Sequence, residues 1–182
     1  MKVGRGHQKN IDAIRKEYNL IRTKGGAIQG GLKHRAKEGV TDQLVPLMDA
    51  DGVEYDRVNY YITQKMSCDL WELTVGRSMP EGVVKWYALN LIRDISETNS
   101  FNYVHRDIKP ENILVSEAGS LCISDYGSTA LISKECKEFD YGTVGYQPPE
   151  MFMNIFMEKP YDNTKVDIFS LGATLIWMHA GA

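Results

Sequence analysis

The chain has 182 residues, of which 43% are hydrophobic and 25% charged, and its formal net charge at pH 7 is −3. These values are typical of a globular protein with one domain or two small lobes, and they exclude a general attraction to nucleic acid or anionic membranes. The start of the chain has no apolar segment of the secretory type. Cys68, Cys122 and Cys136 show no metal-ligand spacing, so we expect free thiols in a soluble, cytoplasmic protein.

The first third of the chain is predicted to contain short strands and one helix. Residues 1–3 suit a short strand, and residues 11–21 carry apolar residues at helical spacing. Two further strands are expected at residues 44–47 and 58–63, with a hairpin turn at Asp51-Gly52 between them. The glycine pairs that precede them are typical of a loop, because no Lys-Ser/Thr pair follows a glycine at the spacing of a phosphate-binding turn.

The rest of the chain is predicted to be mostly helical. Asp69 suits the N-cap of a helix that contains residues 70–73, and Pro80 suits the first turn of a long helix. The long helix would bury an apolar face that consists of Val84, Tyr87, Leu91 and Ile95. Residues 169–177 are strongly apolar, but a membrane span needs about 20 apolar residues. We therefore expect a buried central helix there.

Two motifs carry the chemistry of the chain. Residues 105–112 have the sequence His-Arg-Asp-Ile-Lys-Pro-Glu-Asn, and Asp125-Tyr126-Gly127 begins thirteen residues after Asn112. The first motif places a carboxylate, an ammonium and an amide on one short loop, and the second adds a further carboxylate. These groups can accept a hydroxyl proton, neutralise a migrating phosphoryl group and hold a magnesium ion. The pattern therefore indicates phosphoryl transfer.

Two later motifs complete the pattern. Residues 142–150 have the sequence Gly-Thr-Val-Gly-Tyr-Gln-Pro-Pro-Glu, and residues 166–172 have the sequence Val-Asp-Ile-Phe-Ser-Leu-Gly. Alone, the first of these is typical of a turn-rich connector. In this order the four motifs resemble those of the eukaryotic-type protein kinase family, and the resemblance covers nearly the whole chain.

The resemblance implies an α+β fold with two lobes. Residues 1–63 would form a small, partial N-lobe of antiparallel strands and one helix, residues 64–69 the hinge, and residues 70–182 a mainly helical, partial C-lobe. The family's glycine-rich loop would lie upstream of Lys2, and its later helices would follow residue 182. We therefore expect a kinase domain that is truncated at both ends.

The resemblance also implies a catalytic set. Asp107 would be the catalytic base, and Lys109, which marks the Ser/Thr kinases of the family, would contact the transferred phosphate. Thr143 would bridge Asp107 and Lys109. Asn112 and Asp125 would be the ligands of Mg²⁺.

Several neighbours of this set have structural roles in the same family. Asp167 would anchor the backbone of the turn at Arg106. Tyr126 replaces the usual phenylalanine, so its hydroxyl would need a hydrogen-bond partner if buried. Two interpretations of Glu138 and Asp140 stay open. One of them could pair with Arg106 in place of a phosphate, or both could belong to a solvated run of charges.

The nucleotide is expected to bind between the lobes. Lys2 would orient the phosphates of ATP while Glu17 holds it, unless Lys2 is an ordinary solvated lysine near the terminus. Asp69 would hydrogen-bond the ribose, cap the following helix, or do both. The remaining predicted contacts surround adenine, with Gln64 and Met66 in the hinge and Leu114 beneath the ring.

The function expected from this resemblance is that of a Ser/Thr protein kinase, with ATP and Mg²⁺ as cofactors and a protein as substrate. A rival hypothesis is a truncated pseudokinase that regulates a partner by docking. A small-molecule kinase of related fold is disfavoured by Lys109 and by residues 142–150. No nucleic acid or membrane is expected as a partner, and the oligomeric state is left open.

Overall fold

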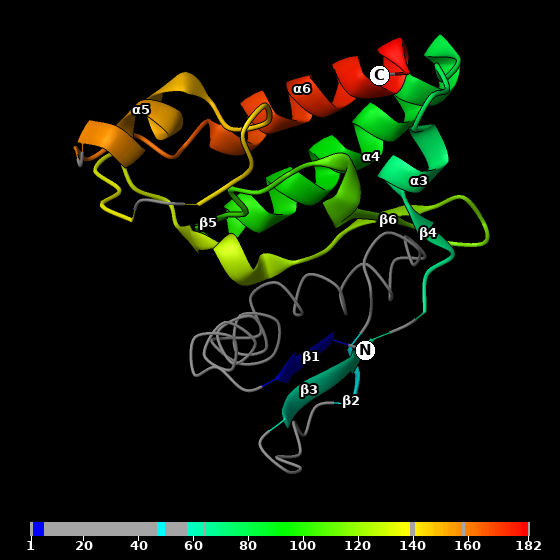
Figure 1. Cartoon of the computed structure of the whole chain (residues 1–182), viewed down its shortest axis with the longest axis horizontal. Helices are drawn as coiled ribbons and strands as arrows, with labels where there is room; N and C mark the ends of the chain where they lie inside the picture. The colour runs from blue at the N-terminus through cyan, green and yellow to red at the C-terminus, as the bar shows by residue number, and fades with distance from the viewer. Residues whose placement is uncertain are drawn as a thin grey trace.

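The computed structural model describes residues 2–5, 47–49, 58–63, 65–138, 141–157 and 159–181. Figure 1 shows a small sheet at one end of these residues and a group of helices at the other. The predicted helix at residues 11–21, the predicted turn at Asp51-Gly52, and Glu17, Gln64 and Asp140 lie outside the described residues.

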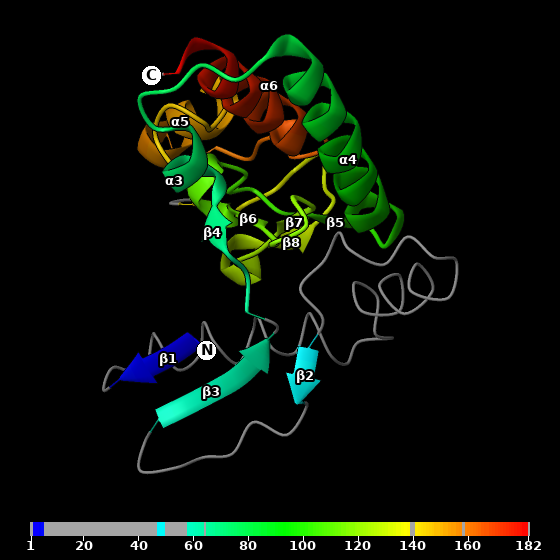
Figure 2. The ribbon, with the colours of Figure 1, turned by 90° about the vertical axis from the view of Figure 1, so that its right-hand side faces the viewer.

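The small sheet contains three antiparallel strands, β1 (Lys2–Arg5), β2 (Leu47–Asp49) and β3 (Val58–Thr63), in the order β1-β3-β2. Figure 2 shows β3 between its two neighbours. The strand expected at residues 58–63 is confirmed with its bounds. Leu47 is the one described residue of the strand expected at residues 44–47, and it begins β2.

A second sheet underlies the helices. It joins β4 (Cys68–Asp69), β6 (Ile113–Val115) and β7 (Leu121–Ile123) in the order β4-β6-β7, and all of its pairs are antiparallel. A separate pair, β5 (Tyr103–Val104) and β8 (Ala130–Leu131), lies beside it. The described residues therefore combine antiparallel sheets with helices, and the α+β class is confirmed.

Four α-helices lie above this sheet in Figure 1: α3 (Leu70–Thr74), α4 (Glu81–Ser100), α5 (Pro149–Met157) and α6 (Val166–Ala180). Two short 3₁₀ turns overlap the two chemical motifs: η1 (Pro110–Asn112) forms the end of the first, and η2 (Tyr126–Ser128) begins within the second. Asp69 caps α3, because its Oδ1 accepts a hydrogen bond of 2.8 Å from the Glu72 N–H, as the capping hypothesis predicted.

The hydrophobic core lies between α4, α6 and the β4-β6-β7 sheet. The predicted apolar face of α4 is confirmed, with Val84 partly buried and the other three members buried. The buried residues of this core are Leu70, Tyr87, Leu91, Ile95, Ile108, Ile113, Val115, Leu121, Ile123, Tyr126, Leu171 and Met178. Among the described residues, no helix has both the length and the apolar character that a membrane crossing requires. This core supports the loop that precedes β6 and the loop that follows β7.

The last turns of α6 are joined to the region of α3. The Trp177 indole N–H donates to the Thr74 hydroxyl over 3.0 Å, and that hydroxyl donates to the Leu70 carbonyl over 2.7 Å. The Met79 N–H donates to the Met178 carbonyl over 2.9 Å. Hydrogen bonds between polar groups therefore add to the apolar contacts that hold α6 against the region of α3.

Candidate active site

The turn at His105 and Arg106 is held by a carboxylate from α6. Asp167 Oδ2 accepts from the His105 N–H over 2.7 Å, and Asp167 Oδ1 accepts from the Arg106 N–H over 2.8 Å. Arg106 has a φ of 70°, a left-handed conformation that non-glycine residues rarely adopt, and these bonds stabilise it. Burial raises the pKa of Asp167, while the hydrogen bonds from the two N–H groups act in the opposite direction. The predicted anchor is therefore present.

Asp107 follows this turn, and three side chains orient its carboxylate. The Thr143 hydroxyl donates to Oδ1 over 2.7 Å, and the Asn112 amide donates to Oδ2 over 2.9 Å. Lys109 Nζ lies 3.2 Å from Oδ2 and donates to the Thr143 hydroxyl over 2.7 Å. The side chains of Asp107 and Lys109 are 14% and 19% exposed, so solvent still reaches both. The structure brings these four predicted residues together.

A glycine next to Thr143 allows Thr143 to reach the catalytic loop expected at residues 105–112. Gly142 has a φ of 84°, and a Cβ built on it would lie 2.9 Å from the Arg106 carbonyl oxygen. Only glycine combines this conformation with so close an approach of two backbones. The Thr143 carbonyl then accepts from the N–H groups of Tyr146 and Gln147, each over 3.0 Å, which closes the turn.

His105 connects the catalytic loop to the second motif. Its Nδ1 accepts from the Asp107 N–H over 3.3 Å, and its Nε2 lies 3.0 Å from the Ser124 carbonyl. Because a carbonyl only accepts, Nε2 must carry the proton, and the ring is in the neutral Nε2–H form. The Ser124 N–H donates to the Asn112 carbonyl over 2.8 Å. Asp125 follows Ser124 directly, so these bonds bring the ends of both motifs together.

The oxygen atoms of Asn112 and Asp125 are suited to a magnesium ion. The Asn112 amide nitrogen donates both to the Asp107 carbonyl, over 2.8 Å, and to the Asp107 carboxylate, which leaves Oδ1 as the atom for coordination. Asp125 has a φ of 62°, and its carboxylate accepts from the Gly127 N–H. The described residues hold no group of three or more His, Cys, Asp or Glu side chains placed for a metal ion. The oxygen pair of Asn112 and Asp125 fits Mg²⁺, which binds one or two carboxylates together with phosphates and water.

Tyr126 fills the apolar position next to this site. Its side chain is 6% exposed and belongs to the hydrophobic core. Its ring meets the ring of His105 edge to face, with 5.0 Å between the centroids. The tyrosine thus packs as the usual phenylalanine of the resemblance would.

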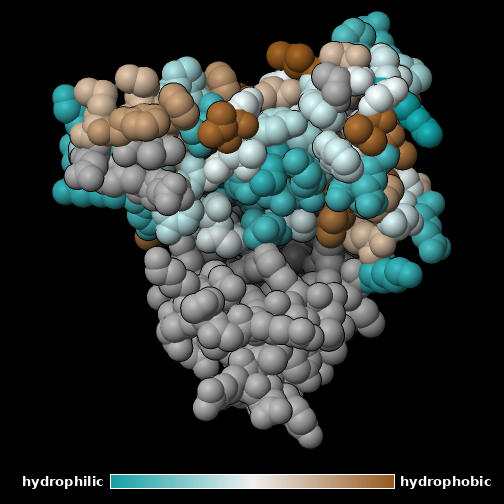
Figure 3. All heavy atoms as spheres, in the orientation of Figure 1, coloured by the Kyte–Doolittle hydropathy of each residue, from teal (hydrophilic) through white to brown (hydrophobic). Residues whose placement is uncertain are grey.

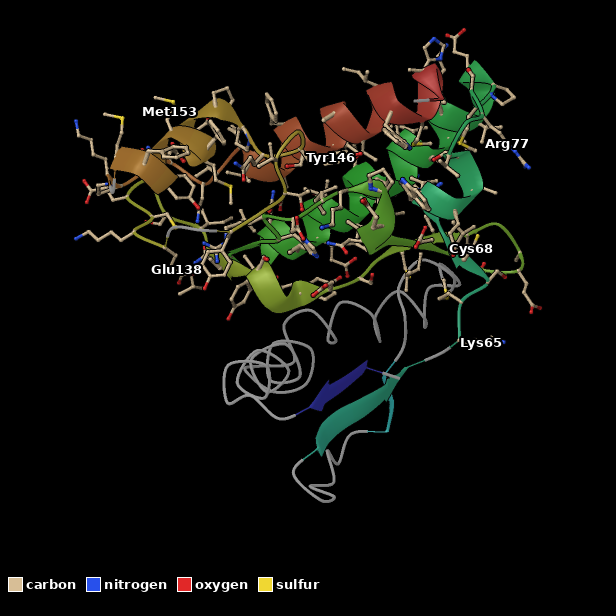
Figure 4. All side chains as sticks on the ribbon, in the orientation of Figure 1. Lys65, Cys68, Arg77, Glu138, Tyr146 and Met153 are labelled. Atoms are coloured by element: carbon tan, nitrogen blue, oxygen red, sulfur yellow. The ribbon has the colours of Figure 1, made fainter. Side chains whose placement is uncertain are left out.

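Two of the predicted nucleotide contacts lie on neighbouring strands, and a third lies shortly before them. Asp69 pairs with Leu114 across β4 and β6, and the Ser67 N–H donates to the Val115 carbonyl over 2.9 Å. Met66 precedes this pairing and is half-buried. Figure 4 shows the segment from Lys65 to Cys68 as the connection from the small sheet to the helical region. The structure describes the Lys2 backbone in β1 but not its side chain.

The Arg106 side chain enters a compact cage and is 0% exposed. Its Nε donates to the Ser128 carbonyl over 2.5 Å, its Nη1 to Cys136 Sγ over 3.8 Å, and its Nη2 to Glu138 Oε2 over 2.7 Å. The ring of Tyr141 lies 4.1 Å from the guanidinium carbon. The pairing of Arg106 with Glu138 is therefore present, and the contacts with Cys136 and Tyr141 were not predicted.

The electrostatics of the cage keep Arg106 charged. Burial alone would lower the pKa of Arg106, but its polar neighbours, with the carboxylate of Glu138 among them, outweigh burial and raise the pKa. Burial raises the pKa of the Tyr161 phenol to about 12. Tyr161 is therefore neutral near pH 7, and Glu138 is the anionic partner of the guanidinium.

The protein kinase domain model matches residues 44–182. The chain belongs to the protein kinase family. The chain is 35% identical over 119 residues to CBL-interacting serine/threonine-protein kinase 20 of Arabidopsis thaliana. The matched segment covers 62% of the chain and 26% of the relative.

Two further relatives give the same family. The kinase is 38% identical over 109 residues to CBL-interacting protein kinase 5 of Oryza sativa subsp. japonica, covering 57% of the chain and 22% of the relative. It is 30% identical over 133 residues to serine/threonine-protein kinase Genghis Khan of Drosophila melanogaster, covering 69% of the chain and 8% of the relative. The chain thus spans between 8% and 26% of the length of these relatives.

Proposed function

We propose that the kinase transfers the γ-phosphate of ATP to Ser or Thr hydroxyls of proteins, with Asp107 as the catalytic base. The observation that supports this most is the carboxylate of Asp107, which is oriented by Thr143, Asn112 and Lys109 and still reached by solvent. Positioned groups of this kind supply most of the acceleration in phosphoryl transfer. Two of the relatives are named as serine/threonine-protein kinases, which favours the same acceptor class.

Each residue of the set has a distinct task in this proposal. The carboxylate of Asp107 accepts the proton of the acceptor hydroxyl, or aligns that hydroxyl for attack. The ammonium of Lys109 lies beside the carboxylate, where it offsets the negative charge of the transferred group. Thr143 fixes the distance between the two, because its hydroxyl bonds to both.

The cofactors in this proposal are ATP and Mg²⁺. Asn112 and Asp125 would hold the ion, which neutralises phosphate charge when it is bound. The other proposed contacts to ATP are the phosphate ligand Lys2 with its partner Glu17, the hinge residues Gln64 and Met66, and Asp69 and Leu114. Of these, Asp69 and Leu114 are neighbours in the β4-β6 pair, which supports a common nucleotide-binding surface.

The proposal is tested by label transfer from γ-labelled ATP to a general basic protein in the presence of Mg²⁺. We expect Asp107→Asn to lower the rate by at least about 10²-fold, the lower range for loss of a general base. Glu117→Gln is the matched control, since it makes the same carboxylate-to-amide change at an exposed residue of the β6–β7 turn. Its rate should equal that of the unchanged chain.

Two outcomes would contradict the proposal. Equal rates for Asp107→Asn and the unchanged chain would remove Asp107 from the mechanism. No transfer by any form, with nucleotide still bound in a calorimetric titration, would instead favour the rival hypothesis of a pseudokinase that acts by docking. Acceptor specificity is read from phosphoamino-acid analysis of the labelled protein.

A further inference from the structure

The contacts of the buried Arg106 guanidinium include one carboxylate and one aromatic ring. Among the described residues Glu138 is its carboxylate partner, and a buried guanidinium that lost such a partner would be strongly destabilised. The second partner is the ring of Tyr141, at 4.1 Å from the guanidinium carbon. A cation over an aromatic ring gains more free energy when water is excluded, as it is from this fully buried side chain.

Tyr141 is placed to transmit this contact to the active site. It is followed directly by Gly142 and Thr143. The Gly142 backbone lies against the carbonyl of the same arginine that the Tyr141 ring covers. Residues 141 and 142 thus contact Arg106 at its side chain and at its main chain.

Arg106 and Thr143 both act on Asp107. Arg106 precedes Asp107 in the chain, and Thr143 donates a hydrogen bond of 2.7 Å to Asp107 Oδ1. If the Tyr141 ring left the guanidinium, the glycine-containing turn that carries Thr143 would lose the side-chain contact that holds its beginning. A shift of about 1 Å at such a position is enough to lower a rate markedly.

We propose that Tyr141 is a positioning residue whose ring, stacked on the buried guanidinium that Glu138 neutralises, holds Thr143 against Asp107. The inference rests on the proposed role of Asp107 as the base.

The experiment compares Tyr141→Leu, which removes the ring, with Tyr141→Phe, which keeps it. Phe156→Leu is the matched control, because Phe156 is 71% exposed on α5 and outside the cage. The first readout is amide hydrogen exchange at Tyr146 and Gln147, whose N–H groups bond to the Thr143 carbonyl. We expect exchange about tenfold faster in Tyr141→Leu and unchanged in the other two variants.

The second readout is the rate of transfer at saturating ATP and acceptor. We expect kcat to fall about tenfold in Tyr141→Leu, with the KM for ATP unchanged, and to be retained in Tyr141→Phe. A variant that merely loosened the fold would also weaken ATP binding.

Unchanged exchange in Tyr141→Leu would overturn the inference, as would faster exchange with an unchanged kcat. Loss of kcat in Tyr141→Phe would overturn it too, because the ring is then not the group that matters. The exchange readout needs no activity. A chain that transfers no label would therefore refute the proposed function separately, while the exchange at Tyr146 and Gln147 still decides whether the ring holds this turn.

Discussion

A single hydroxyl group organises the polar contacts of the candidate active site. The Thr143 hydroxyl has one hydrogen, which it donates to Asp107 Oδ1, and it accepts a hydrogen from Lys109 with a lone pair. A methyl group in its place would leave a carboxylate and an ammonium that still attract each other but are no longer held at a fixed angle. The residue therefore contributes geometry rather than charge.

Replacement of this hydroxyl separates its geometry from its volume. We expect Thr143→Val, which is nearly equal in size, to lower kcat by at least about tenfold, because both hydrogen bonds of the hydroxyl are lost. Thr143→Ser should keep most of the activity, since it keeps the hydroxyl. Steady-state kinetics at saturating ATP would check this. Equal rates for Thr143→Val and the unchanged chain would show that Lys109 and Asp107 need no bridge.

At the level of elements, the turn that carries Thr143 depends on two glycines in different surroundings. Gly142 and Gly145 both have a positive φ, of 84° and 95°. A Cβ at Gly142 would meet the Arg106 carbonyl, the end of Met151 and the Gln147 side chain, whereas a Cβ at Gly145 would meet nothing within 4 Å. Gly142 is therefore favoured both by its positive φ and by the lack of space for a side chain, whereas Gly145 is favoured only by its positive φ.

The two glycines should therefore differ when replaced by alanine. Gly145→Ala should lower the free energy of unfolding by about 1–2 kcal/mol, the cost of a left-handed non-glycine residue. Gly142→Ala should cost more than this and should also reduce transfer, because the segment must move away from the catalytic loop. Denaturant unfolding and label transfer would measure both effects. A smaller loss of stability for Gly142→Ala than for Gly145→Ala would contradict the steric argument.

The sequence predicted elements and local motifs better than contacts between segments. The anchor at Asp167 and the set around Asp107 could be predicted because the motifs that carry them occur in the order of the family resemblance. The stacking of Tyr141 on Arg106 was not predicted, because it depends on the path of an irregular segment between two residues that are 35 positions apart. No periodicity marks such a contact. The roles of Lys2, Glu17 and Gln64 stay predictions, since their side chains lie outside the described residues.

At the scale of the whole molecule, the described residues include exposed large apolar side chains on α5 and α6. Figure 3 shows tan and brown atoms over α5 and at the upper edge of α6. Figure 4 marks Met153 on the same side of α5. The exposed large apolar residues of these two helices are Phe152, Met153, Phe156, Met157, Ile168, Phe169 and Ile176. Apolar surface that gathers in this way promotes association in solution.

Polar replacements on this surface should change association without changing the fold. Phe156 and Ile176 are each 71% exposed, so we expect Phe156→Gln with Ile176→Gln to leave the free energy of unfolding within about 0.5 kcal/mol per site. Binding of a hydrophobic dye and light scattering should both decrease. Leu91→Gln, at a fully buried position of α4, is the contrasting control and should unfold the chain. Equal dye binding before and after the double replacement would place the accessible apolar surface elsewhere.

The whole catalytic set lies between Thr74 and Trp177 in the sequence. The hydrogen bond between Thr74 and Trp177 joins residues that are 103 positions apart. At a synthesis rate of about 5–20 residues per second, roughly 5–20 s separate the appearance of these two partners on the ribosome. During that interval the nascent catalytic loop has no α6 beside it, and so no Asp167 to hold the left-handed turn at Arg106. We expect the active site to become ordered only after α6 has left the ribosomal tunnel, whatever the order in which its own residues were made.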